Sequence, residues 1–166
     1  LLGDKTMPAA ISLGEILRNS IEEKKLEFQG RVEFQLNLEG DLVLSIPPGD
    51  PFMWRRMFSN IFNNSIEAAD DPLAKISISV RRFERGIIVE IQDNGKGIAP
   101  DLLDKIGERG FSFGKGRISG LGISSAKEFV EKEGGRIDIR SKLNQGTTVS
   151  ISIPFFEKAI LIEDDH

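Results

Sequence analysis

Hydrophobic residues recur along the chain with two spacings, one typical of helices and one typical of strands. Apolar residues at helical spacing follow Ser12 and predict a helix over 13–27, with Ser12 as its N-cap. Strict alternation of apolar and polar residues predicts a strand over 32–38. A short second strand over 42–46 is expected to pair with it as a hairpin.

A central helix is predicted from Pro51 to about Ala69, because Asp50 can cap it and Pro51 suits its first position. Its apolar face is marked by Met53, Met57 and Ile61 at four-residue spacing, with Phe58 and Phe62 alongside. The pattern therefore predicts a helix with one face packed on a core.

The rest of the chain alternates paired strands with one more helix. Strands are predicted over 75–83 and 87–93, and a helix over 123–132 follows a long segment. Strands over 136–141 and 147–154 close the pattern as a second hairpin. Hairpin pairs in place of βαβ crossovers predict an α+β fold, with a mixed, mostly antiparallel sheet covered on one face by helices.

Asp93 ends the apolar face of the strand over 87–93, since alternate residues of a strand share a face. A carboxylate at the edge of a core is costly unless something donates hydrogen bonds to it, and an amino group on a flat ring is a suitable donor. Gly95 and Gly97 would let the backbone approach such a ring. Thr147 points inward at the same core edge, so hydroxyl and carboxylate could together read one base edge.

Glycine is concentrated between residues 95 and 122, which hold eight of the chain's 17 glycines. A loop of this length in a compact domain is more often a functional lid than a spacer. Gly120-Leu121-Gly122 is expected to lie directly before the helix over 123–132, whose N-terminus offers free N–H groups and a positive dipole end to a phosphate chain.

Asn60 and Asn64 lie one turn apart on the central helix, although asparagine is a poor helix former. They are either solvent-facing amides or a functional pair that orients a water and supplies an oxygen ligand to Mg²⁺, which prefers oxygen. Glu67 follows at the next turn.

The composition excludes several classes of function and of site. With 166 residues and 39% hydrophobic content, one core is expected. A net charge of −4 without a basic block argues against nucleic-acid binding. The chain has no cysteine and its one histidine is His166, which excludes thiolate metal sites and an internal histidine triad. With no apolar run of membrane-spanning length, we expect no membrane contact and a cytoplasmic location, although a longer parent protein could be membrane-anchored.

Four motifs in order resemble those of the catalytic, ATP-binding domain of sensor histidine kinases. This family falls in the superfamily that includes gyrase, the heat-shock chaperone ATPases and the mismatch-repair ATPases. The N box corresponds to 60–68, the first glycine box to 93–97, the F box to 111–113 and the second glycine box to 120–122. The resemblance implies a Bergerat-type two-layer α/β sandwich over 12–156 with a flexible ATP lid. Residues 1–11 would then form a linker.

The resemblance also implies roles for individual residues. Asp93 would accept the adenine amino group, and Gly95, Gly97 and Ile98 would shape the adenine pocket, with Thr147 as a further nucleotide contact. The second glycine box, Gly120, Leu121 and Gly122, would meet the phosphates. Lys115 and Arg117 are either cations for the β and γ phosphates or ordinary solvated side chains.

Asn64 would be the Mg²⁺ ligand, so ATP and Mg²⁺ are the expected cofactors. Asn60 stands where gyrase-like relatives carry a water-activating glutamate, and an amide cannot act as a general base. This suggests phosphoryl transfer with Asn60 at the catalytic centre, in place of rapid hydrolysis. Two features depart from the family pattern. Glu67 replaces a basic residue, and the glycine and threonine that usually precede the second glycine box are absent, with Ser119 as a candidate to replace the threonine hydroxyl.

The expected function is transfer of the ATP γ-phosphoryl group to a histidine on a separate dimerisation domain of the same protein. A response regulator or a fused receiver domain would then be a partner. Residues 157–166 resemble the start of a receiver domain, or form a polar tail after one extra strand. The alternatives are a serine kinase of the anti-sigma-factor type and a non-catalytic nucleotide-sensing or partner-docking module.

Overall fold

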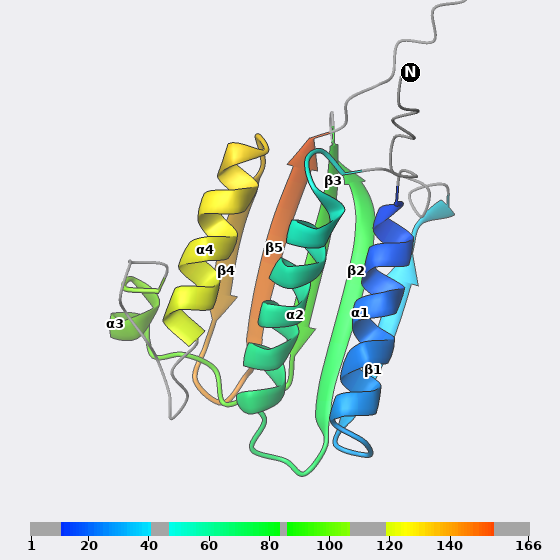
Figure 1. Cartoon of the computed structure of the whole chain (residues 1–166). Coiled ribbons are helices and arrows are strands. Elements are labelled where there is room, and N and C mark those ends of the chain that lie inside the picture. The colour runs from blue at the N-terminus through cyan, green and yellow to red at the C-terminus, as the bar shows by residue number, and fades with distance from the viewer. Residues whose placement is uncertain (1–10, 41–46, 84–85, 107–118, 155–166) are drawn as a thin grey trace, which may run out of the picture.

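The computed structural model describes residues 11–40, 47–83, 86–106 and 119–154, the last range without the side chains of its first three residues. A five-stranded sheet in the order β1-β2-β3-β5-β4 forms one layer, and α1, α2 and α4 cover one of its faces (Figure 1). The strands are β1 (Val32–Leu38), β2 (Ala74–Phe83), β3 (Gly86–Asp93), β4 (Arg136–Ser141) and β5 (Thr147–Pro154). The helices are α1 (Leu13–Glu27), α2 (Pro51–Glu67), α3 (Pro100–Leu103) and α4 (Ser119–Lys132).

The sheet is mixed and mostly antiparallel, which confirms the predicted fold class. The pairs β2–β3, β3–β5 and β4–β5 are antiparallel. The pair β1–β2 is parallel, with Val32 opposite Ala74. The expectation that hairpins replace all βαβ crossovers was therefore wrong at this pair, because α2 carries the chain back along the sheet before β2 begins.

Local sequence explains where α1 and α2 begin. Ser12 and Glu15 form a capping box, in which the Glu15 N–H donates to the Ser12 Oγ at 3.2 Å and the Ser12 N–H donates to the Glu15 carboxylate at 3.1 Å. Asp50 caps α2 by accepting from the Phe52 N–H at 2.9 Å, and proline occupies the first turn. Both predicted starts are confirmed.

Two features of the segment after β3 correct the sequence-based expectations. The first is α3, which begins with Pro100 and lies inside the segment expected to be a loop. The second is α4, which begins at Ser119, four residues before the predicted start, so the second glycine box lies within its first turns. Glycine disfavours a helix, but Gly122 of α4 lies against Asn60 of α2, and this tertiary contact overrides the local preference.

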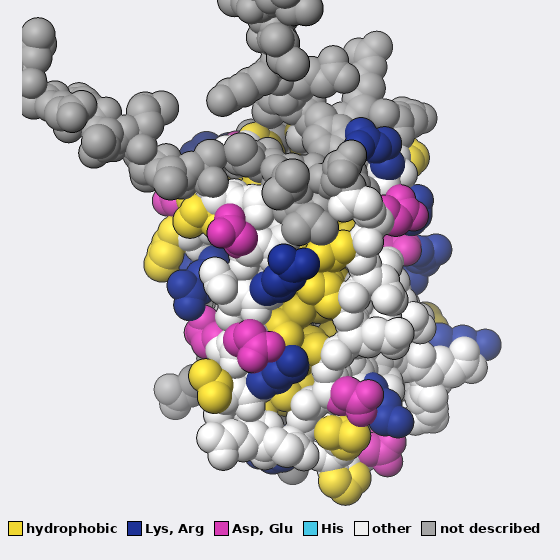
Figure 2. Space-filling model, turned by 90° about the vertical axis from the view of Figure 1, so that its right-hand side faces the viewer, with side chains coloured by type: hydrophobic (Ala, Val, Ile, Leu, Met, Phe, Trp, Pro, Cys, Tyr) yellow, Lys and Arg dark blue, Asp and Glu magenta, His cyan; other side chains and the backbone are white. Residues whose placement is uncertain are grey.

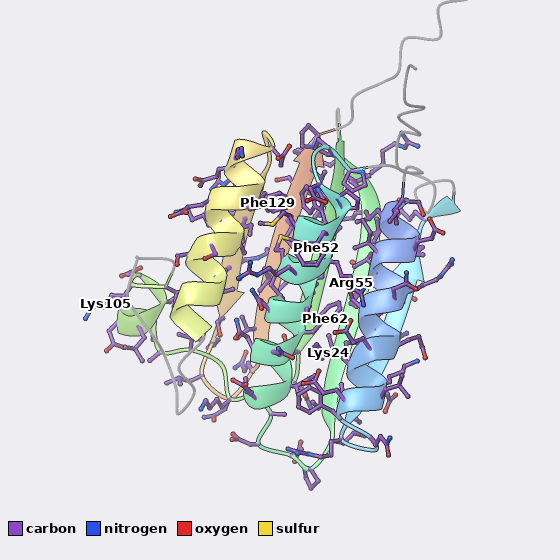
Figure 3. The ribbon with its side chains drawn as sticks, viewed as in Figure 1. Lys24, Phe52, Arg55, Phe62, Lys105 and Phe129 are labelled. Atoms are coloured by element: carbon purple, nitrogen blue, oxygen red, sulfur yellow. The ribbon has the colours of Figure 1, made fainter. Side chains whose placement is uncertain are left out.

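Aromatic residues of α2 form the centre of the core between the helices and the sheet. Trp54, Phe58 and Phe62 are fully buried. The Phe62 ring meets Phe34 of β1 edge to face at 5.2 Å, and Trp54 meets Phe129 of α4 at 4.8 Å. Figure 3 labels Phe62 on α2 and Phe129 on α4. These ring contacts hold α2 against β1 and α4.

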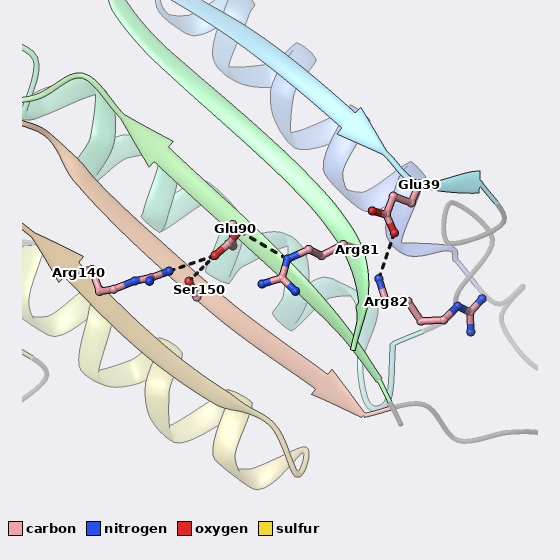
Figure 4. Close-up of polar contacts among 6 residues, drawn as sticks. All are labelled: Glu39, Arg81, Arg82, Glu90, Arg140 and Ser150. Carbon is pink, nitrogen blue, oxygen red and sulfur yellow. Dashed lines mark hydrogen bonds and ion pairs between the residues drawn. The ribbon is translucent and has the colours of Figure 1, made fainter. Parts of the chain in front are cut away.

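The sheet presents a different surface at its edge and on its open face. A view onto the α1–β1 side shows a strip of apolar side chains flanked by charged ones (Figure 2), and alternate residues of β1 are partly buried there. On the open face, Glu90 of β3 pairs with Arg140 at 3.2 Å and with Arg81 at 3.7 Å (Figure 4). Ser150 also donates to Glu90 at 3.3 Å, so this face is polar.

Four predicted segments fall wholly or mostly outside the described residues: the strand over 42–46, the central part of the lid, the linker over 1–11 and the tail over 157–166. Within the described part of the chain, no helix is both long enough and apolar enough to cross a membrane.

Candidate functional site

Asp93 is the buried carboxylate around which the predicted site is built. It is the last residue of β3 and only 7% exposed. Its Oδ1 accepts hydrogen bonds from the backbone N–H of Gly95 at 2.9 Å and of Thr147 at 3.1 Å. The side chain of Ser65, on α2, is a third donor. Strand alternation predicted this inward position, and the donors explain how the carboxylate is tolerated there.

Burial raises the pKa of Asp93 above its ordinary value, because a charged carboxylate loses hydration in the interior. The hydrogen bonds from Gly95, Thr147 and Ser65 lower the pKa and oppose this shift without cancelling it. Both backbone donors go to the same oxygen, Oδ1. The environment therefore provides an acceptor whose charged form would gain from one further donor.

The glycines of the first glycine box are explained by contacts with the protein backbone. A Cβ on Gly95 would lie 2.8 Å from the carbonyl oxygen of Ala68, at the end of α2. Gly97 has φ +68°, and a Cβ there would lie 2.0 Å from the carbonyl oxygen of Lys142. The sequence pattern predicted that these glycines let the backbone approach a ring ligand. The structure gives them a packing reason, and their role toward a nucleotide stays a prediction.

The β4–β5 hairpin braces the first glycine box. The Asn144 N–H donates to the carbonyl oxygen of Lys96 at 2.8 Å. Gly146 has φ +77°, and a Cβ on it would lie 2.0 Å from the carbonyl oxygen of Asp93. Any residue other than glycine would push the hairpin away from Asp93, so the turn before β5 helps to hold the carboxylate in place.

Asn60 and Asn64 lie on α2, and both are half-buried. Within the described part of the chain, neither side-chain amide forms a hydrogen bond with another residue. Gly122 of α4 lies against Asn60, at 3.6 Å between the Asn60 Cβ and a Cβ built on the glycine. The structure thus brings the second glycine box next to the N box, and it shows no partner for either amide among the described residues.

The remaining polar residues at the end of α2 differ from these two. The side-chain oxygen of Asn63 is buried and has no hydrogen-bond partner among the described residues. Glu67 is exposed. Asn63 therefore differs from Asn60 and Asn64 in having a buried side-chain oxygen.

A groove of about 670 Å³ runs between α2 and α4 and reaches Asn60. Its apolar lining comes from Met53, Met57, Ala126 and Phe129, and its charged lining from Asp50, Arg56, Glu128, Lys132 and Glu133. Asn60 is therefore open to solvent along this groove as well as lying next to Gly122.

Several predicted site residues cannot be placed in full. Lys115, Arg117 and the F box lie outside the described residues. Gly120 and Leu121 are described only in their backbone, as part of the first turn of α4.

Sequence reasoning missed Ser65, Ser141 and Gly146. Ser141, the last residue of β4, hydrogen-bonds both Ile98 and Thr147. Ser65 directly follows Asn64, on the next position of the helix, and a serine inside an apolar helix face was a usable sign of a buried polar contact.

Comparison with known proteins agrees with the fold. The family model described as "Histidine kinase-, DNA gyrase B-, and HSP90-like ATPase" matches residues 49–157, more than half of the chain. Sporulation kinase B of Bacillus subtilis is 32% identical over 123 residues, which cover 74% of this chain and 28% of that protein. Sensor histidine kinase ZraS of Escherichia coli is 28% identical over 145 residues, covering 87% of this chain and 30% of that protein. The chain spans roughly a third of the length of such relatives.

Solved structures show the same fold. The mycobacterial sensor histidine kinase MprB superposes with a TM-score of 0.71 at 23% identity, over 84% of this chain and 93% of that one. The catalytic domain of histidine kinase ThkA gives a TM-score of 0.71 at 24% identity, over 86% of this chain and 92% of that one. The resemblance drawn from the four motifs is thus confirmed, and the chain belongs to the family of histidine kinase-, DNA gyrase B- and HSP90-like ATPases.

Proposed function

We propose that this chain is the ATP-binding catalytic domain of a sensor histidine kinase and transfers the γ-phosphoryl group of ATP to a histidine on a separate dimerisation domain. The observation that carries the proposal is Asp93, a buried acceptor at the end of β3 whose two backbone donors share one oxygen. An ionised carboxylate in this setting favours a ligand that donates, as the adenine amino group does.

The residues near Asp93 fit a nucleotide that extends toward α4. Asn60 and Asn64 carry amide oxygens without protein partners in the described part of the chain, and Gly122 keeps a side chain out of the space beside Asn60. Amide oxygen is an acceptable ligand for Mg²⁺, so Asn64 would hold the metal. When bound, ATP would supply the phosphoryl group, and Mg²⁺ would neutralise part of the negative charge on the phosphates.

Asn60 favours transfer over hydrolysis. An amide can orient a group by hydrogen bonds, but it has no basic form that could take a proton from water. The chain would therefore contribute positioning and leave the attacking nucleophile to the partner histidine. We place the domain in the cytoplasm, where ATP is available, with a response regulator or fused receiver domain as the later phosphate acceptor.

The proposal is tested by joining the chain to a histidine-bearing helical dimerisation domain and supplying ATP labelled at the γ phosphate with Mg²⁺. The expected product is a phosphohistidine, which is labile in acid and stable in base. A matched fusion with the acceptor histidine changed to glutamine should take up no label. Tight ATP binding without labelling would support a non-catalytic nucleotide-sensing module, and acid-stable label on serine would support a serine kinase.

A further inference from the structure

Ser141, the last residue of β4, lies between two predicted site residues that come from different parts of the chain. Its Oγ accepts a hydrogen bond from the backbone N–H of Ile98 at 2.8 Å. It also lies 2.8 Å from Oγ1 of Thr147 and donates to the carbonyl oxygen of Gly146 at 3.0 Å. Ser141 therefore connects β4, the start of β5 and the segment that follows the first glycine box.

The single proton of the Ser141 hydroxyl limits how these contacts can be satisfied together. The carbonyl of Gly146 has no proton, so Ser141 donates in that bond. The contact with Thr147 is then a hydrogen bond only if Thr147 donates its own proton to Ser141. In this arrangement all three contacts are satisfied, and the Thr147 hydroxyl has only lone pairs to offer a ligand.

Thr147 is also tied to Asp93, because its backbone N–H donates to the Asp93 Oδ1 at 3.1 Å. The carboxylate of Asp93 and the committed hydroxyl of Thr147 are therefore two hydrogen-bond acceptors held by one connected set of bonds. A purine amino group donates to such acceptors, whereas an oxo group at the same ring position is itself an acceptor and is repelled.

We propose that Ser141 is a positioning residue that makes the pocket select adenine over a 6-oxo purine, by committing the proton of the Thr147 hydroxyl. This inference rests on the proposed nucleotide-binding function. When Ser141 is absent, the Thr147 hydroxyl is free to rotate and to donate to an oxo group. The penalty against the 6-oxo purine then falls.

The test compares ATP with inosine triphosphate, whose base carries an oxo group in place of the amino group and a proton on the adjacent ring nitrogen N1. Calorimetry on the 166-residue chain should show that Ser141→Ala narrows the ratio of the two affinities by about three- to tenfold, the value of one neutral hydrogen bond. Ser141→Thr keeps the hydroxyl and should retain the wild-type ratio. If Ser141 is only structural, both affinities will fall in parallel and the ratio will not change, which overturns the inference.

A second arm asks whether Ser141 acts through Thr147. Thr147→Val removes the hydroxyl, so adding Ser141→Ala to it should leave the ratio where Thr147→Val alone sets it. If Ser141→Ala changes the ratio in the Thr147→Val background as much as in the wild type, Ser141 acts independently of Thr147, which overturns the inference. Ser152→Ala is the matched control, because its Oγ donates to the carbonyl oxygen of Arg136 at the exposed end of β4 and β5.

This experiment distinguishes the role of Ser141 from the proposed nucleotide binding. A wild-type chain that binds ATP but shows no change of ratio in Ser141→Ala would overturn the role of Ser141 alone. A wild-type chain that binds neither nucleotide would overturn the proposed function, and the role of Ser141 with it.

Discussion

Gly122, in the first turn of α4, lies directly against Asn60 of α2, with 3.6 Å between the Asn60 Cβ and a Cβ built on the glycine. This distance is an ordinary van der Waals contact, so Gly122→Ala should fold. Replacing a helical glycine with alanine should raise the free energy of unfolding by about 0.5–1 kcal/mol.

The same variant should lose function, because the methyl group fills the space beside the Asn60 amide. We expect ATP-dependent labelling of a joined dimerisation domain to fall at least about tenfold, as misplacement of a positioning group does. Thermal unfolding and labelling are measured on one preparation. A more stable variant with undiminished labelling would show that Gly122 and Asn60 only pack together.

Gly97 should respond in the opposite way to the same change. With φ +68° and only 2.0 Å between a Cβ and the carbonyl oxygen of Lys142, Gly97→Ala combines backbone strain with a clash. Together these should cost about 2–4 kcal/mol of the free energy of unfolding. Urea unfolding measures the loss, with Gly122→Ala as the control. A loss under about 0.5 kcal/mol would contradict the packing role assigned to Gly97.

The asparagines of α2 provide a matched pair for testing the metal site. Asn64→Ala should remove most of the difference between ATP affinities measured with and without Mg²⁺, while metal-free binding stays near that of the wild type. Asn63→Ala should keep the full Mg²⁺ effect. It should also stabilise the fold, because alanine favours a helix and the change removes a buried oxygen without a partner. Equal Mg²⁺ effects in Asn64→Ala and the wild type would make Asn64 a structural amide.

The pH dependence of ATP binding follows from Asp93. Burial raises the pKa of its carboxyl group, so the group takes up a proton at a higher pH than an ordinary aspartate, whose pKa is about 3.9. A protonated Asp93 is a weaker acceptor for an amino group. We expect ATP affinity to fall on acidification as the pH passes through this raised pKa. Asp93→Asn should show a flatter profile in calorimetric titrations over the same range.

Stability should show the opposite trend. Because the folded state of the nucleotide-free protein holds the Asp93 proton more tightly than the unfolded chain does, stability due to this group decreases as the pH rises from the ordinary aspartate pKa to the raised one. Above that window the loss is complete and constant. The unfolding temperature of the wild type, measured relative to that of Asp93→Asn, should therefore fall with rising pH, and only between these two pKa values. If the wild type instead gains stability relative to Asp93→Asn as the pH rises, the pKa of Asp93 is not raised.

The sequence was sufficient for most of the fold because local and tertiary preferences agree there. The capping residue Ser12 and the pair Asp50-Pro51 mark helix starts that the structure confirms. Alternation likewise placed Asp93 on the buried face of β3. At these positions no longer-range contact competes with the local pattern.

Tertiary contacts decide the features that the sequence did not reveal. The parallel pairing of β1 with β2 depends on the path of α2, and the early start of α4 depends on the close approach of Gly122 to Asn60. Ser141 hydrogen-bonds a backbone N–H 43 residues away in the chain, so no local pattern could identify it.

Asp93→Asn tests whether the buried carboxylate selects the adenine of ATP. The side chains have the same shape, and the asparagine oxygen can still accept from the N–H groups of Gly95 and Thr147, so the variant should fold with an unfolding temperature at or above that of the wild type. Replacing a charged acceptor with an amide should weaken ATP binding by about 2–3 kcal/mol, or roughly 30- to 150-fold in calorimetric affinity. If a folded Asp93→Asn chain binds ATP within about twofold of the wild type, the carboxylate of Asp93 does not select adenine.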